Sequence, residues 1–562
     1  MKKKLYEFEL DWRDYVFPKS ESQFATPDEL KETFDSIDLQ DNEPNSSGIP
    51  LFVSDNKAIV NNFTENTIVY GETGSKKTRC CIKPLLYSLI RSEESTIITD
   101  PKGELASDPT IRGLLKEHGY FTYFLDFRNF KADSYNILEH AFKLYQNGDE
   151  DRAMENVARI IHSLGRKYEG TKADPFWSST SEQILIPLIH ILMDVFRDEA
   201  DGKQNINMMT LSSYINEEGL ETLGQIIERH CDGINNSSLA MLRGALSGSE
   251  KTTANISAST STFLQPFLIQ PAMTEMLSNS SFQIEGMYDW PTVLFIITPD
   301  ETSTYDAICG MLIDNIYARL IDVYTRKYQN RCQPGCRVNF VCDEFCNLKI
   351  NDMGPKISAC RSREIRFFLV CQSMKQLEST YPDAAIIEGN CKNIIFMQSS
   401  DISLLQYISA LCGTTNITES GEPEPLVSLG MLKNLKKEQD FKEILFIRDN
   451  IIYRGKFPDC DTYQCIQKYH SSQPCDIPTR TTNGIQVFSP DLLWSALNNF
   501  HLRKPFSSQT HDTISNKKDN KSYTSLDVEK SLSTLRQELK ELQKDLTDLC
   551  SYFDDDEAEA EE

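Results

Sequence analysis

The 562-residue sequence predicts an α/β fold in which a largely parallel sheet carries a helical insertion. Short apolar, β-branched runs alternate with helix-like segments early in the chain and return after residue 289, a pattern typical of a parallel sheet flanked by helices. Between these two regions the chain reads as helical, with few β-branched clusters. Because 40% of the residues are hydrophobic, the chain can form about two or three domains with cores of their own.

The α/β domain is expected in two parts, residues 51–145 and residues 289–470. A polar segment, residues 1–50, precedes them and ends in Asn-Ser-Ser-Gly-Ile-Pro, which predicts a poorly packed lead-in and linker. The expected strands are continuous apolar runs, as in strands that are buried on both faces. They lie at residues 67–70, 95–99, 121–125, 292–297, 338–342, 366–371 and 393–397, and a terminal hairpin follows at 443–453.

An all-α insertion, residues 146–288, is expected between the two parts. Its predicted helices cover residues 154–164, 177–196, 209–215 and 218–230. The longest apolar run of the chain, residues 184–193, contains Pro187 and His190. It is shorter than the roughly 20 residues that a membrane-spanning helix needs, so it predicts a buried helix.

The strand at 67–70 runs into a pattern that resembles a phosphate-binding loop, G-x-x-x-x-G-K-[ST]. In such a loop, backbone N–H groups and a helix N-terminus point at the β- and γ-phosphates, so the backbone must come close. The lysine places its charge on these phosphates, and the following hydroxyl holds Mg²⁺. The predicted nucleotide-binding residues are Gly71, Glu72, Thr73, Gly74, Ser75, Lys76, Lys77, Thr78, Arg79 and Asp343, of which Thr78 and Asp343 would hold Mg²⁺.

Lys76 stands where the loop pattern has glycine. A long side chain at this place could crowd the nucleotide, which would leave an inactive scaffold. Alternatively, the side chain could swing out to solvent and leave the backbone cradle intact. We favour the second interpretation, which predicts nucleotide binding with a turnover that is retained or reduced.

Polar residues follow the later strands. Asp343 and Glu344 come directly after the strand at 338–342, where Asp343 would join the Mg²⁺ shell and Glu344 would polarise the attacking water; a surface acidic pair is the alternative. Gln372 follows the strand at 366–371 and would reach the γ-phosphate, because open α/β sheets bind ligands at the carboxyl ends of their strands. Arg361 and Arg363 precede that strand, and one of them could act as an arginine finger in a ring, unless it is a solvated surface residue.

The overall composition limits the partners and the redox setting. A formal net charge of −25 repels DNA and anionic lipid at long range, so any nucleic-acid contact must use a local basic lining. The sixteen cysteines are scattered along a chain that does not open with a signal peptide, which favours reduced thiols. A zinc site among Cys332, Cys336, Cys342 and Cys346 is the minor alternative, since their spacing departs from the common paired pattern.

The C-terminal part differs from the rest. Residues 471–525 are polar and rich in Ser, Thr, Asn, Lys and Pro, which predicts a mobile linker. Residues 526–562 carry leucines and one valine at alternating spacings of four and three, followed by an acidic run. This pattern predicts a heptad helix, which would pack on its own domain, form a coiled coil or dock a partner.

Six ordered motifs together resemble the type IV secretion coupling proteins, the TraG/TraD-like group of conjugative DNA transfer ATPases. The resemblance covers residues 50–470. The matching stretches are Gly71–Thr78 with Pro84-Leu-Leu, Asp100-Pro-Lys-Gly-Glu104, Asp174-Pro-Phe-Trp177, Val341-Cys-Asp-Glu-Phe345, Gln372-Ser373 with Gln376-Leu377, and Ile408-Ser409 with Leu411-Cys-Gly-Thr-Thr415.

The resemblance implies a RecA-like P-loop NTPase domain and a hexameric ATPase that uses ATP and Mg²⁺. It links single-stranded DNA with its relaxase and relaxosome, or a protein cargo, to a type IV secretion channel. The family roles fall on Glu344, Gln372 and Arg361, and the tail would recognise cargo. Family members usually begin with transmembrane helices, which this sequence lacks. Three alternatives follow: a soluble variant, a protein that relies on a separate membrane anchor, or a shortened version. We expect a cytoplasmic protein, which a separate anchor could hold at the inner face of the membrane.

Two other interpretations stay open at this point. The chain could be a non-hydrolysing adaptor with a degenerate phosphate loop that gathers relaxosome or secretion partners. It could also be another ring translocase, such as a DNA-packaging motor. The Asp-Pro-Lys-Gly-Glu stretch and the Trp177-bearing insertion fit the coupling group better than such a motor.

Overall fold

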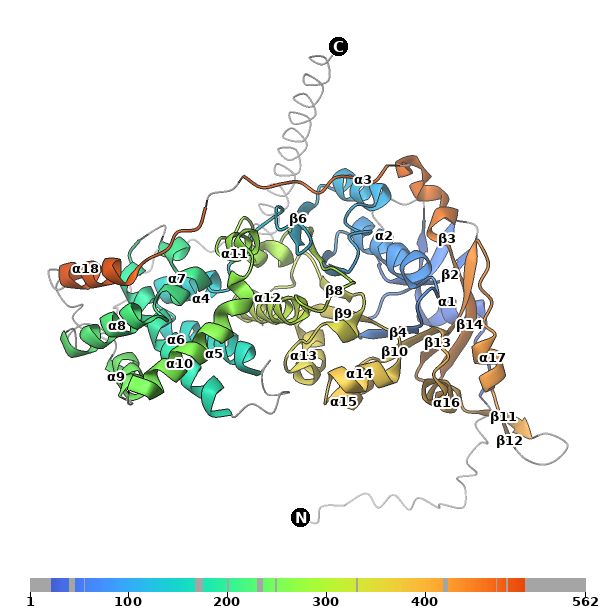
Figure 1. Cartoon of the computed structure of the whole chain (residues 1–562). Coiled ribbons are helices and arrows are strands. Elements are labelled where there is room, and N and C mark those ends of the chain that lie inside the picture. The colour runs from blue at the N-terminus through green and yellow to red at the C-terminus, as the bar shows by residue number, and fades with distance from the viewer. Residues whose placement is uncertain are drawn as a thin grey trace, which may run out of the picture.

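The computed structural model describes residues 22–39, 46–54, 56–166, 175–199, 202–229, 236–247, 250–329, 332–417, 423–471, 473–481 and 484–500. The predicted heptad helix and acidic tail, residues 526–562, lie outside the described residues. Within the described part, a sheet domain and a helical domain lie side by side (Figure 1). Among the described helices, none is both long enough and apolar enough to cross a membrane.

A nine-stranded, largely parallel sheet forms the centre of the first domain, as the sequence predicts. Seven neighbouring strands are parallel, and an antiparallel hairpin completes one edge. The strands, in their order across the sheet, are β14 (Ile451–Pro458), β13 (Phe441–Arg448), β10 (Asn393–Gln398), β4 (Thr67–Gly71), β9 (Ile365–Cys371), β8 (Val338–Cys342), β5 (Ser95–Asp100), β7 (Thr292–Ile297) and β6 (Phe121–Asp126).

Helices cover both faces of this sheet, which explains the continuous apolar runs in its strands. Alternate residues of β4 pack into two different cores: Ile68 and Tyr70 on one face, Val69 on the other. The first face is covered by α12 (Asp306–Lys327), η4 (Phe345–Asn347), α13 (Met353–Ala359), η5 (Cys360–Arg363), α14 (Met374–Thr380), α15 (Ala384–Gly389), α16 (Ile402–Leu411) and α17 (Leu429–Lys433). The second is covered by η1 (Thr78–Ile82), α2 (Lys83–Arg91), α3 (Pro109–Glu117), η6 (Cys460–Thr462) and η7 (Gln464–Tyr469).

A small N-terminal sheet corrects the prediction of a poorly packed segment at 1–50. Its strands are β1 (Asp35–Asp38), β3 (Lys57–Asn61) and β2 (Ile49–Ser54), in that order, and α1 (Pro27–Thr33) precedes them. Leu30 and Phe34 are buried in the same core as α2, and Thr26 caps α1 in a capping box with Glu29. The prediction failed because it relied on the polar composition of the whole segment, in which these few apolar residues are a minority. A further short pair, β11 (Thr414–Ile417) and β12 (Pro423–Pro425), lies outside both sheets.

The helical domain is inserted between β6 and β7. It contains α4 (Glu139–Gln146), α5 (Glu150–Arg166), α6 (Pro175–Phe196), η2 (Gly202–Asn205), α7 (Met208–Ser213), α8 (Glu217–Arg229), α9 (Asn236–Leu246), α10 (Glu250–Leu268), α11 (Pro271–Met276) and η3 (Ile284–Tyr288). The apolar run at 184–193 lies in α6, where Leu188 and Leu192 are fully buried. The prediction of a buried helix is therefore confirmed.

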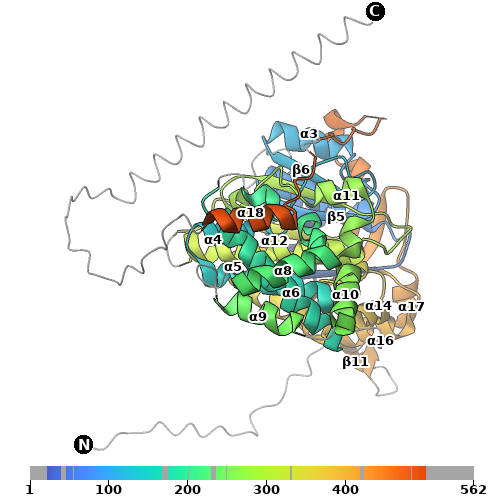
Figure 2. The same ribbon diagram turned by 60° about the vertical axis from the view of Figure 1, so that its left-hand side comes forward.

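The prediction of a mobile linker at 471–525 is wrong for its described part, residues 473–481 and 484–500. This segment, called the strap below, crosses from the sheet domain to the helical domain (Figure 1). Arg480 donates to the carbonyls of Phe130 and Ala132, and Phe488 packs on Phe196. The strap ends in α18 (Pro490–Phe500), which contacts α8 and α6 and buries Leu493 (Figure 2).

Candidate nucleotide-binding site

The phosphate loop connects the carboxyl end of β4, in the middle of the sheet, to η1 and α2. A Cβ atom at Gly71 would lie 2.6 Å from Ser75 Oγ and 3.0 Å from Lys77 Cγ, so a larger residue there would displace the side chains that line the turn. Gly74 has a φ of +79°, which also favours glycine. Ser75 Oγ is buried and has no hydrogen-bond partner within the described part of the chain. A narrow turn with an unsatisfied buried hydroxyl fits a phosphate-binding cradle.

Lys77 closes this cradle. Its Nζ donates to the carbonyl oxygens of Gly71, at 2.5 Å, and Glu72, at 3.3 Å, so the ammonium group lies within the loop. Thr78 is the first residue of η1, directly after this lysine. The placement of a lysine inside the turn and of a hydroxyl at the helix start matches the expected roles toward phosphate and Mg²⁺.

Asp343 and Glu344 follow β8, as the sequence predicts. Burial, aided by the charge of Glu344, raises the pKa of Asp343 to about 7, although the nearby Lys77 ammonium opposes this shift. The main-chain carbonyl of Asp343 accepts a 2.9 Å hydrogen bond from Thr99 of β5. Glu344 has a φ of +51°, a strained conformation for a non-glycine residue. A buried carboxyl with a raised pKa beside a strained acid marks a candidate functional site.

Gln372 joins the acid to the phosphate loop. Its strand, β9, lies between β4 and β8, so its carboxyl end falls between the two halves of the site. Gln372 Nε2 donates to Glu344 Oε2 at 2.7 Å, and Thr73 Oγ1 donates to Gln372 Oε1 at 3.5 Å. Three sequence-predicted residues from separate motifs thus form one hydrogen-bonded line, Thr73–Gln372–Glu344.

Lys76 and Arg79 direct their side chains elsewhere. Lys76 Nζ donates to the carbonyl of Gln439 at 2.6 Å and to Asp459 Oδ2 at 2.9 Å. Arg79 binds Asp459 and Asp461. Of the two alternatives for Lys76, the structure has the one in which the side chain turns outward. It ends on a buried carboxylate and not in solvent.

Arg361 does not lie with the other predicted catalytic residues. Its guanidinium binds Thr64 Oγ1 at 3.1 Å and Glu65 at 3.4 Å, at the amino-terminal edge of the sheet. The phosphate loop is at the opposite, carboxyl edge of the same strands. Arg361 is therefore out of reach of the nucleotide site in its own chain, and its side chain is 62% exposed.

Sequence reasoning missed several residues that touch the phosphate loop. The carbonyl of Gln398, at the end of β10, accepts a 2.9 Å hydrogen bond from the Glu72 amide. Lys437, in the segment before β13, donates to the carbonyl of Gly74. Asp459 follows β14. Single polar residues in loops carry no motif, so only the sheet order, which places β10 beside β4 and β13 beside β10, could have drawn attention to them.

The loop Asp100–Glu104 after β5 also lies at this edge. Asp100 Oδ2 accepts hydrogen bonds from the amides of Leu105 and Ala106, and burial raises the pKa of Asp100 to about 6. A cavity of about 180 Å³ opens next to Glu344. Its lining includes four further groups that would repel a triphosphate or attract a cation: Asp300, Glu301, Asp306 and Asp343.

A phosphate loop on a central parallel strand, with acidic and amide side chains at the ends of the next strands, defines the P-loop NTPase class of fold. A model of the family described as "Type IV secretory system Conjugative DNA transfer" matches residues 29–451. This match spans most of the chain, so the chain belongs to that family. The resemblance seen in the sequence is thereby confirmed.

Three similar solved structures share this fold. They are the bacterial conjugative coupling protein TrwBdeltaN70 in an unbound monoclinic form, and the plasmid coupling protein TrwB in complex with the ATP analogue ADPNP and with ADP and Mg²⁺. Each has a TM-score of 0.51 and 14% sequence identity, and each alignment covers 82% of this chain and 94% or 95% of the other. At this identity the likeness concerns the fold alone. No curated protein matches the sequence.

Proposed function

We propose that the chain is the coupling ATPase of a conjugative type IV secretion system. It would use ATP hydrolysis to recruit single-stranded DNA with its relaxase, or a protein cargo, and deliver it to the transfer channel. The observation that carries this proposal is the line Thr73–Gln372–Glu344, which joins the phosphate loop to a candidate catalytic acid. That TrwB was solved with an ATP analogue and with ADP and Mg²⁺ supports the choice of nucleotide.

The residues of the site would divide the work as follows. Lys77 exchanges its bonds to the carbonyls of Gly71 and Glu72 for the β- and γ-phosphates. Thr78 and Asp343 would hold Mg²⁺, and a bound Mg²⁺ would supply positive charge that neutralises the phosphates. A carboxyl must be ionised to bind a metal ion, so Asp343, whose pKa is raised to about 7, would give up its proton in order to hold Mg²⁺. Glu344 accepts a proton from the attacking water, and Gln372 orients Glu344.

The assembly and the cargo are parts of the same proposal. Arg361 cannot serve its own site, so an arginine finger at this position would have to act on the nucleotide of a neighbouring subunit, as in a homo-hexamer. Since the net charge is −25, a DNA path would need a local basic lining and its affinity would fall steeply with salt. The cytoplasmic location and the separate membrane anchor stay predictions from the family resemblance.

The test is an ATPase assay on the full chain with and without a single-stranded oligonucleotide, in wild type, Lys77→Ala and Glu344→Gln. We expect DNA-stimulated turnover that both substitutions abolish, with nucleotide binding retained in Glu344→Gln. Steady turnover that neither substitution changes would contradict the site. Nucleotide binding without turnover in the wild type would favour the non-hydrolysing adaptor.

A further inference from the structure

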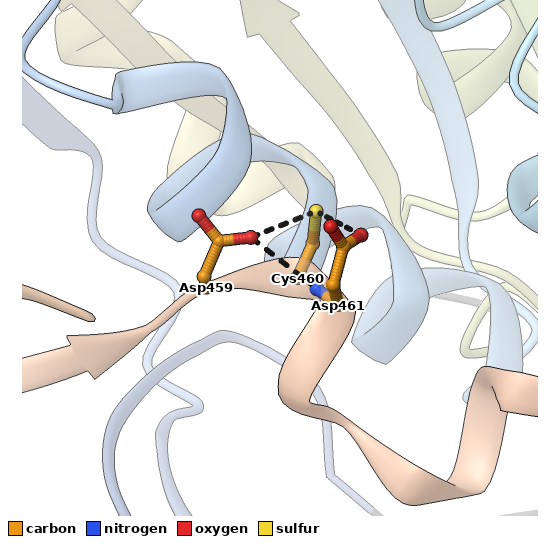
Figure 3. Close-up of side chains that lie close together, drawn as sticks. All are labelled: Asp459, Cys460 and Asp461. Atoms are coloured by element: carbon orange, nitrogen blue, oxygen red, sulfur yellow. Dashed lines mark hydrogen bonds between the residues drawn. The ribbon is translucent and has the colours of Figure 1, made fainter. Parts of the chain in front are cut away.

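Asp459 lies just after β14, where the chain turns along the helices that follow the phosphate loop (Figure 3). It is separated from Lys76 by 383 positions in the sequence. Its side chain is 3% exposed, so its negative charge is almost fully removed from water. Such a charge destabilises the fold unless cations and hydrogen-bond donors surround it.

Two cationic side chains of the phosphate-loop segment supply these partners. Lys76 Nζ lies 2.9 Å from Asp459 Oδ2, and Arg79 Nε lies 3.0 Å from the same oxygen. A second guanidinium nitrogen of Arg79 donates to Asp459 Oδ1. Burial alone would raise the pKa of Asp459, but the hydrogen bonds from Arg79 and Lys76 outweigh it and hold the pKa well below its usual range.

The backbone of Lys76 shows why this anchoring matters. Its φ is +66°, the left-handed conformation that the glycine of the loop pattern adopts without strain. A lysine in this conformation is strained, and its side chain starts next to the cradle. The bonds to Asp459 and to the Gln439 carbonyl draw the ammonium group to the side of the β13–β14 hairpin.

We propose that Asp459 is a positioning residue for the phosphate loop. It fixes the Lys76 ammonium group outside the cradle, so that the loop keeps a nucleotide-binding shape although its glycine is absent. The proposal rests on the proposed function of the loop. It extends that function by naming a distant residue on which a lysine-containing phosphate loop depends.

A metal site is the competing interpretation of the same cluster, because ligand atoms of Asp459, Cys460 and Asp461 lie within 4.8 Å of one another. The charges favour the positioning role of Asp459, in which its carboxylate holds the Lys76 ammonium group; this contact is called the clamp below. Both carboxylates already bind Arg79, and His470 lies 3.3 Å from Asp461. Burial raises the pKa of Cys460 to about 12, so its thiol keeps its proton near neutral pH. Cationic side chains therefore occupy the place where a metal ion would bind.

A double-mutant cycle tests the proposal with wild type, Lys76→Gly, Asp459→Asn and the double variant. We expect Asp459→Asn to raise the KM for ATP about tenfold with a smaller change in kcat, because a freed Lys76 disturbs binding before chemistry. In the Lys76→Gly background, the same substitution should change KM by less than about threefold. An equal effect in both backgrounds would overturn the proposal, since Asp459 would then act without Lys76.

A second readout does not depend on ATP. Amine-reactive labelling of the full chain, followed by mass spectrometry, reports how accessible Lys76 is. We expect Lys76 to become at least about fivefold more reactive in Asp459→Asn and to stay protected in Asp461→Asn, which alters the Arg79 pair but not the Lys76 pair. Unchanged labelling in Asp459→Asn would overturn the clamp. If the wild type bound no ATP while labelling behaved as expected, only the proposed function would fail.

Metal binding is measured on the same variants by adding Mn²⁺ or Zn²⁺ to the nucleotide-free protein. We expect Asp461→Asn to retain as much metal as the wild type. A bound ion that is lost in both Asp459→Asn and Asp461→Asn would overturn the clamp in favour of a metal site.

Discussion

The strands of the central sheet have charged residues at both ends, and the two ends, called the amino-terminal edge and the carboxyl edge, differ in how well these charges are paired. At the amino-terminal edge, the buried Arg366 binds Glu94 at 2.7 Å, Asn339 at 2.8 Å and Ser47 at 3.0 Å. Burial lowers its pKa to about 10, so it still carries its charge at neutral pH, and Glu94 opposes this shift. At the carboxyl edge, Asp343 has a raised pKa and Glu344 a strained backbone. The same strands thus begin in a satisfied network and end in groups that favour a ligand, which separates stabilising residues from functional ones.

The largest effect is expected at the carboxyl edge. Glu344→Gln should lower ATP turnover by about 10²–10⁴-fold, because the amide cannot accept a proton from water. Nucleotide affinity and the free energy of unfolding should change little, since the residue keeps its shape. Turnover is followed by phosphate release and stability by urea unfolding. A large loss of stability together with activity would place Glu344 among the structural residues.

The matching substitution at the amino-terminal edge is Arg366→Met. We expect a loss of about 3–5 kcal/mol in the free energy of unfolding, because the buried Glu94 loses its nearer cationic partner and keeps the more distant Arg337, at 3.6 Å. Arg361→Met is the control on the same edge: its side chain is 62% exposed, and the loss should be below about 1 kcal/mol. Equal losses in the two variants, measured by urea unfolding, would remove the contrast between buried and exposed pairs.

Gln372→Ala sharpens the account of how the carboxyl edge works. Hydrogen bonds to charged groups contribute about 1.5–3 kcal/mol, so the lost bond to Glu344 should lower kcat about 10- to 100-fold. Lys375→Ala in α14 is the control, because its side chain is 70% exposed and it should leave kcat within about twofold. An unchanged kcat in Gln372→Ala would show that Glu344 needs no orienting partner.

The smallest effect is a pH dependence at the amino-terminal edge. Burial would raise the pKa of Glu94, but Arg366 and Arg337 outweigh it and the pKa is lowered from 4.5. A carboxyl group whose pKa is lower in the folded state stabilises the protein at pH values above its pKa in the unfolded state. This stabilisation is lost as the pH falls through the pKa of the folded state. Urea unfolding of wild type and Glu94→Gln should therefore differ most above pH 4.5 and converge in acid. A constant difference would contradict the shift.

Much of the site could be predicted because its parts are local patterns. The strands at 292–297 and 338–342 are confirmed residue for residue, since a run buried on both faces is continuously apolar. Gly71 ends a strand, and Lys77, Asp343, Glu344 and Gln372 come after strands, so a parallel sheet brings all of them to one edge. The strap at 473–500 could not be predicted, because a polar segment that docks through a few residues such as Arg480 and Leu493 looks like a linker.

The sequence by itself determined the α/β class, the phosphate loop with its acidic and amide partners, and the family, because each depends on short runs of neighbouring residues. The tertiary structure alone decided what Lys76 does. Its side chain could have filled the cradle or left it, and the outcome depends on a carboxylate at Asp459. The sheet order puts the β13–β14 hairpin beyond β10, and only the path of the chain after β14 brings that charge against the loop.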